Sequence, residues 1–217
     1  MTPADDVAGP GDRVGLDDRA GPGDRAGLDD LPFRTEVEIA LLLVSPRHRY
    51  EGRPTDGARP VGADDPDESR DRIELRAGLG IVGDRYFAAR AHVHASVTVI
   101  SLEGLEAVGT AIGATVDPAA TRRNVFLRGA DVEALRGEPF SLESLLPGGD
   151  GSDALGRAVR FRGYRAANPC AWMDHEVAPG AFRAMRGRGG VRCDPESDGV
   201  LTLGPAVLRT ARPVALD

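Results

Sequence analysis

Short apolar runs that end at glycine or proline recur along this chain, and they constrain its fold more than any other feature. The first, Glu36–Val44, alternates polar and apolar residues and then becomes continuously apolar, as a strand does where it enters a core. It ends at Ser45-Pro46, where a β-ladder cannot continue. Similar runs predict further strands at residues 72–76, 97–100, 139–142, 159–166, 191–193, 200–203 and 206–210. About eight short strands with short helices between them predict a mainly β (α+β) domain built as a β-barrel.

Two local signals complete this interpretation. Ser101 is expected to cap a helix in which Leu102, Leu105, Val108 and Ile112 form a narrow apolar stripe. Asp198-Gly199 is a turn signal between residues 191–193 and 200–203, and it predicts that these two strands pair as a hairpin.

The chain divides into a tail and one domain. A repeat of twelve residues that begins at Gly9 and again at Gly21 is too polar to bury a core, so residues 1–32 are expected to be a disordered acidic tail. Residues 33–217 are then a single domain. Residues 51–71 are rich in glycine, proline and aspartate, and a long mobile loop is expected there.

The charge distribution limits the function. All 27 basic residues are arginine, which excludes a P-loop lysine, a Schiff-base lysine and a lysine general base. The net charge is -7, yet residues 155–192 hold eight arginines against Asp174 and Glu176. Exposed aromatic residues do not interleave with these arginines, so a small anionic ligand is a better partner than nucleic acid.

The cysteine count and the absence of targeting signals indicate a cellular compartment. Two cysteines form no disulfide framework, and no apolar stretch predicts a signal peptide or a membrane span. A reducing cytoplasm is therefore expected, in which a free thiol remains available for chemistry.

Cys170 has a reactive thiol and is predicted to lie just after the end of a strand. It follows the predicted strand 159–166 and Asn168-Pro169, and the apolar Ala171-Trp172-Met173 comes after it. A soft thiolate at the mouth of a barrel suits metal ligation or sulfur chemistry. The alternative is a buried cysteine that acts as a small apolar residue.

Five segments in order resemble the MOSC domain, the C-terminal domain of molybdenum cofactor sulfurase. They lie within residues 36–210, and they are Gly80-Ile-Val-Gly-Asp-Arg-Tyr-Phe, Val97-Thr-Val-Ile-Ser-Leu-Glu, Thr121-Arg-Arg-Asn-Val with Arg128-Gly, Asn168-Pro-Cys, and Arg186-Gly-Arg-Gly-Gly-Val-Arg. The resemblance implies a MOSC-type β-barrel with short peripheral helices, and it implies that the protein binds the molybdenum cofactor (molybdopterin).

The resemblance also assigns roles to single residues. Cys170 matches the cysteine implicated in ligating molybdenum or carrying sulfur, and it is the candidate catalytic residue. The candidates for contact with the anionic pterin or its phosphate are Arg122, Arg123, Asn124, Asn168, Asp84 and Arg85. For the arginines and Asn124 the alternative is a solvated strand entrance, and for Asp84 and Arg85 an ordinary ion pair or turn cap.

Several functions remain open at this point. Cys170 could carry sulfur delivered by a cysteine desulfurase. It could instead ligate molybdenum in a reductase of N-hydroxylated substrates, which would need a separate electron-donor protein because the sequence has no iron–sulfur, haem or flavin motif. A non-catalytic binder of another phosphorylated small molecule is a third possibility. A zinc site from His92, His94, His175 and Cys193 is disfavoured because their spacing matches no zinc pattern.

Overall fold

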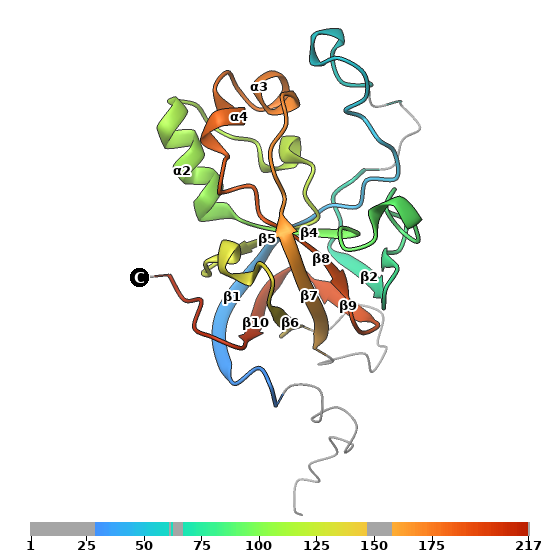
Figure 1. Ribbon diagram of the computed structural model, residues 1–217, viewed down its shortest axis with the longest axis vertical. Coiled ribbons are helices and arrows are strands. Elements are labelled where there is room, and N and C mark those ends of the chain that lie inside the picture. The colour runs from blue at the N-terminus through green and yellow to red at the C-terminus, as the bar shows by residue number, and fades with distance from the viewer. Residues whose placement is uncertain (1–28, 61, 63–66, 147–157, 217) are drawn as a thin grey trace, which may run out of the picture.

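The computed structural model describes residues 29–60, 62, 67–146 and 158–216, and these residues form ten strands with short helices between them (Figure 1). The strands are β1 (Phe33–Leu42), β2 (Arg72–Arg76), β3 (Gly80–Ile81), β4 (Val97–Ser101), β5 (Val125–Arg128), β6 (Pro139–Ser144), β7 (Val159–Ala166), β8 (Val191–Pro195), β9 (Gly199–Thr202) and β10 (Gly204–Thr210). Seven of them close a barrel in the order β1-β10-β6-β7-β8-β4-β5, with β5 paired back to β1. The predicted mainly β fold, a barrel with short helices, is confirmed.

The remaining strands, β2, β3 and β9, form a separate three-stranded sheet in the order β3-β2-β9. The predicted hairpin between residues 191–193 and 200–203 is therefore wrong. β8 pairs with β7 and β4 inside the barrel, whereas β9 pairs with β2. The turn at Asp198-Gly199 passes the chain from one sheet to the other.

The barrel interior is filled by inward-facing residues, which alternate with outward-facing residues along each strand. On β7, Val159, Phe161 and Gly163 are buried while their neighbours are more exposed, as the period of two requires. Phe161 stacks on Phe140 of β6, with ring centroids 5.1 Å apart. Apolar side chains of the barrel strands form one packed core cluster, so we look for a binding site at the barrel rim.

The helices lie beyond one end of the barrel, the end at which β7 points (Figure 1). They are α2 (Leu102–Ile112), α3 (Trp172–Glu176) and α4 (Ala181–Ala184). The described residues also form four single-turn 3-10 helices, η1 (Pro54–Asp56), η2 (Arg90–His92), η3 (Pro118–Thr121) and η4 (Val132–Leu135), of which η4 packs against the barrel through Val132 and Leu135. Ser101 caps α2 as predicted, because its Oγ accepts a hydrogen bond from the Gly104 amide at 3.1 Å. A second apolar cluster, including Leu105, Trp172 and Met185, joins the three helices to the barrel.

The folded domain reaches further back than the predicted boundary at residue 33. Leu31 is fully buried, and Asp30 forms an ion pair with Arg160 of β7 at 2.6 Å. The rest of the predicted tail, residues 1–28, lies outside the described residues. Of the predicted mobile loop 51–71, residues 61 and 63–66 also lie outside them. Within the described ranges, no helix combines the length and the apolar character needed to cross a membrane.

Candidate functional site

Cys170 lies in the loop between β7 and α3, as the sequence predicts. It is exposed and free of any disulfide bond, so the alternative of a buried structural cysteine is wrong. The Cys170 carbonyl accepts a hydrogen bond from the Met173 amide at 2.9 Å, and both Trp172 and Met173 are buried. The thiol is therefore presented to solvent from a packed base at the end of the barrel.

Arg123 ties this loop to the barrel. Its Nη2 donates to the Ala167 carbonyl at 2.9 Å and its Nε to the Gly189 carbonyl at 3.0 Å, while Nη1 donates to the Thr121 carbonyl at 3.3 Å. Burial, followed by the charge of Arg192, lowers the pKa of Arg123 to about 10, so the guanidinium stays protonated at neutral pH. Arg123 thus joins the end of β7 to the start of β8 and keeps a fixed positive charge at the base of the Cys170 loop.

Two glycines allow the strands to approach each other at this point. A Cβ on Gly189 would lie 2.2 Å from the Ala167 carbonyl oxygen, and one on Gly190 would lie 2.2 Å from the Val99 carbonyl oxygen. The Gly190 amide donates to Oε1 of Glu133 at 2.7 Å, and its carbonyl accepts from the Ala167 amide at 2.7 Å. The Gly189-Gly190 pair is therefore required for packing the site rather than for contact with a ligand.

Three arginines gather on the outer side of the same region. The antiparallel register of β7 and β8 places Arg165 directly opposite Arg192. Arg85, from the turn after β3, contacts the Tyr86 ring, and its charge acts on the same pair: burial and then the charges of Arg165 and Arg85 lower the pKa of Arg192. We call Arg85, Arg165 and Arg192 the arginine cluster. The sequence predicts Arg85 as a ligand-binding residue but does not single out Arg192. The excess of arginine over acidic residues in 155–192 was the signal that could have found it.

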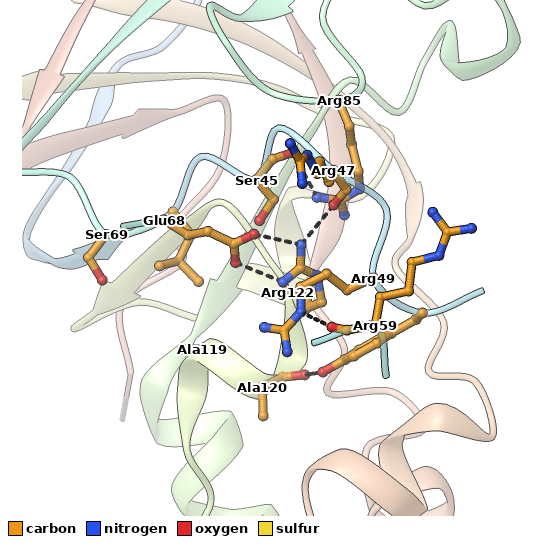
Figure 2. A network of polar contacts seen from close by, with 12 residues as sticks. Ser45, Arg47, Arg49, Arg59, Glu68, Ser69, Arg85, Ala119, Ala120 and Arg122 are labelled. Atoms are coloured by element: carbon orange, nitrogen blue, oxygen red, sulfur yellow. Dashed lines mark hydrogen bonds and ion pairs between the residues drawn. The ribbon is translucent and has the colours of Figure 1, made fainter. Parts of the chain in front are cut away.

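Arg122 is held by a carboxylate of the chain itself. Its Nη1 and Nη2 donate to the two carboxylate oxygens of Glu68 at 2.7 and 3.0 Å, and Nη2 also donates to the Arg47 carbonyl at 3.1 Å (Figure 2). The side chain is only 6% exposed, and the backbone adopts a left-handed conformation with φ of 56°. The predicted contact of Arg122 with a phosphate would require Glu68 to be displaced.

Asn124 and Asp84 are buried and hydrogen-bond to each other. The Asn124 Oδ1 accepts from the Thr98 amide at 3.0 Å, and its Nδ2 donates to the Leu43 carbonyl and to Asp84 Oδ2, each at 3.2 Å. Asp84 also accepts from the Ser45 amide at 3.0 Å. Both the oxygen and the nitrogen of the Asn124 side-chain amide take part in these hydrogen bonds. Asn124 and Asp84 therefore join β4, β5 and the end of β1.

Of the two remaining candidates, Arg85 faces the arginine cluster and Asn168 faces solvent. The Arg85 guanidinium lies 4.4 Å from the ring centroid of Tyr86, and its Nη1 is 3.8 Å from Asp84 Oδ2. Asn168 is exposed, two residues before the thiol. The predicted site residues thus separate into an exposed pair, Cys170 and Asn168, and a buried framework, Arg122, Asn124 and Asp84. Arg85 is mostly buried, with 13% of its side chain exposed, and Arg123 ties the cysteine loop to the barrel.

Residues 46–60 connect Arg122 to the cysteine loop. The Tyr50 ring stacks on Trp172 at 5.1 Å, and the guanidinium of Arg122 lies 5.5 Å from the same ring. The Tyr50 hydroxyl donates to the Ala120 carbonyl, and the Ala58 amide donates to Glu176 of α3. This part of the predicted mobile loop is therefore anchored against α3.

The described residues contain no group of three or more histidine, cysteine or acidic side chains that could hold a metal ion. Cys193 is buried inside the barrel opposite Gly163, and burial raises the pKa of its thiol well above the usual range. His94 instead faces Tyr164, with ring centroids 4.0 Å apart.

Comparison with known proteins supports the fold. No family model and no curated protein matches the chain. Among solved structures, the YUAD protein from Bacillus subtilis is similar over 83% of this chain and 99% of its own, with 15% identity and a TM-score of 0.59. YiiM from Geobacillus stearothermophilus is similar over 79% of this chain and 74% of its own, with 13% identity and a TM-score of 0.49. The likeness to the YUAD protein shows a shared fold.

Proposed function

We propose that this protein binds the molybdenum cofactor in the manner of a MOSC domain, with Cys170 as its reactive residue. The observation that carries the proposal is the exposed thiol of Cys170, held at the end of the barrel above the fixed cation Arg123. The shared fold with the YUAD protein and the ordered sequence segments that resemble a MOSC domain support the same assignment.

The residues present fit this cofactor in chemistry. A thiolate is a soft ligand for molybdenum, and the arginine cluster offers planar donors to a phosphate. The buried Nε of Arg85 has no hydrogen-bond partner within the described part of the chain, which is a donor that an anionic ligand would satisfy. Cys170 and Arg85 would thus hold the cofactor, while Arg122, Asn124 and Asp84 support the loops that carry them.

Two roles of Cys170 agree with its exposure. As a metal ligand, it would fix the cofactor, whose molybdenum supplies two-electron redox chemistry when bound. As a sulfur carrier, its thiolate would attack the outer sulfur of a persulfide on a cysteine desulfurase, which forms a persulfide on Cys170 and releases the thiolate of the desulfurase. Both roles require that a second molecule reach the thiol, and an exposed loop permits this.

The test is to produce the protein in a host that makes the cofactor and to purify it without oxygen. Molybdenum is then measured by mass spectrometry and pterin by the fluorescence of its oxidised form. Cys170→Ser should lose bound molybdenum and keep much of the pterin, because phosphate contacts remain. Cys193→Ala serves as the matched control, since it removes the buried thiol and keeps the exposed one.

Two further results decide the role and the proposal. A mass gain of about 32 Da at Cys170 after treatment with a cysteine desulfurase, reversed by a reductant, favours the carrier. Stoichiometric molybdenum without that mass gain favours the metal ligand. If wild-type protein contains neither pterin nor molybdenum when cofactor is in excess, the proposal is wrong although the fold stands.

A further inference from the structure

The pairing of Arg165 with Arg192 is unfavourable in the protein alone. The two residues are direct partners in the antiparallel register of β7 and β8, so their side chains leave the same face of the barrel. Like charges directly opposite each other destabilise a sheet. A register irregularity lies between Gly163 and Arg165, and it is what brings the two arginines opposite each other. The fold therefore brings two like charges together where a regular ladder would pair Arg165 with a different residue.

No acidic side chain relieves this repulsion within the part of the chain that the structure describes. Arg165 and Arg192 form no ion pair or side-chain hydrogen bond there, whereas Arg122, Arg128 and Arg160 all pair with carboxylates. Arg85 adds a third charge, and its own ion pair with Asp84 is long, with 3.8 Å between Nη1 and an Oδ2 that already accepts hydrogen bonds from Ser45 and Asn124. Among the described residues, Arg165 and Arg192 are therefore the members of the cluster that have no acidic partner.

A wall of aromatic rings borders the cluster. The Tyr86 ring lies under the Arg85 guanidinium and contacts the His92 ring, with centroids 3.9 Å apart. Burial, and then the charges of Arg192, Arg85 and Arg165, lower the pKa of His92, which favours its neutral form. The wall thus adds apolar contact surface and no competing charge.

We propose that the arginine cluster is a binding site for a phosphate-sized oxyanion, either the phosphate group of a small organic molecule or a free inorganic ion. Such an anion accepts hydrogen bonds from several guanidinium groups at once, and it cancels the repulsion between Arg165 and Arg192. The aromatic wall favours a phosphate monoester whose organic part carries a planar ring. The identification of that monoester with the cofactor rests on the proposed function, but the anion site itself does not.

The test measures binding of inorganic phosphate, sulfate and phenyl phosphate to the cofactor-free protein by calorimetry. Arg165→Gln and Arg192→Gln should each weaken phenyl phosphate binding by about tenfold or more, since each removes a charge-assisted contact. In the same variants, the Tm without ligand should stay equal or rise, because a repulsion has been removed. Arg34→Gln is the matched control, as Arg34 is an exposed arginine of β1 with no part in the cluster. This combination separates a binding role from a structural one, since a structural arginine would lower the Tm when removed.

Each outcome decides the proposal. Phenyl phosphate binding tighter than phosphate supports a monoester, and tighter binding of phosphate or sulfate supports a free oxyanion in the same site. If no probe binds, or if the cluster variants bind as Arg34→Gln does, the site does not exist. The cofactor assay distinguishes the two proposals. If both cluster variants lose phenyl phosphate binding but retain the cofactor undiminished, the anion site stands and its identification with the cofactor phosphate is wrong. If the variants lose anion binding in a protein that never holds cofactor, only the proposed function is wrong.

Discussion

Replacing Asn124 by alanine separates a structural role from a ligand-binding role at this residue. Asn124 is 4% exposed, and its side chain makes three hydrogen bonds, at 3.0, 3.2 and 3.2 Å, to Thr98, Leu43 and Asp84. At about 1 kcal/mol for each bond, Asn124→Ala should lower the free energy of unfolding by about 3 kcal/mol. For a chain of this size, each kcal/mol shifts the Tm by about 2–4 °C, so the expected drop is about 6–12 °C.

Asn168→Ala provides the matched control for this measurement. Asn168 is the same residue type and lies near the same thiol, but it is exposed and makes no side-chain hydrogen bond with any described residue. Its replacement should leave the Tm within about 1 °C, as surface substitutions usually do. Thermal melts of both variants followed by circular dichroism test the pair. An Asn124→Ala protein that melts with the wild type while losing pterin would refute the structural role and restore the predicted cofactor contact.

Three further predictions concern the surroundings of the thiol. In the folded protein one thiol should react rapidly with Ellman's reagent and Cys170→Ser should abolish that reaction, because Cys193 is buried; two fast thiols would contradict this arrangement. Gly190→Ala should destabilise the protein by at least about 2 kcal/mol, since its Cβ would meet the Val99 carbonyl at a φ of 86°, and an unchanged urea midpoint would show that the strands can separate. Burial raises the pKa of Glu133 above its usual 4.5, so its contribution to stability is present below that pH and is lost as the pH rises through the folded-state pKa. Glu133→Gln should therefore gain stability relative to wild type between acidic and neutral pH, and a difference in urea midpoint that does not change with pH would oppose the prediction.

The strands could be predicted from the sequence because their cause is local. Alternation on β7 and the cap at Ser101 depend only on near neighbours in the chain, and both are confirmed. Which strand pairs with which is not a local property of the sequence. The turn signal at Asp198-Gly199 therefore predicts a hairpin of β8 with β9, whereas β9 pairs with β2. A turn signal shows where the chain bends but not which sheet it then joins.

The same distinction applies to the candidate site. The place of Cys170 between a strand and a helix follows from Asn168-Pro169 and the apolar residues after it, and the structure has it there. The partner of Arg122 is Glu68, in a segment that the sequence describes only as a polar loop. Arg192 faces Arg165 only because of an irregular register. These contacts depend on long-range strand pairing and register, which no pattern in the sequence predicts.

The closure of the barrel by β1 and β10 has a consequence for synthesis. Among the described strands, β1 is synthesised first, and it pairs with β5 on one side and on the other with β10, which is synthesised last of them. Until β10 emerges, one edge of β1 and one edge of β6 remain open to other chains, and such edges are sites of aggregation. Non-local closure of this kind also slows folding. We therefore expect nascent chains that stop before Gly204 to depend on chaperones, whereas a chain that includes β10 closes both edges by adding a single strand.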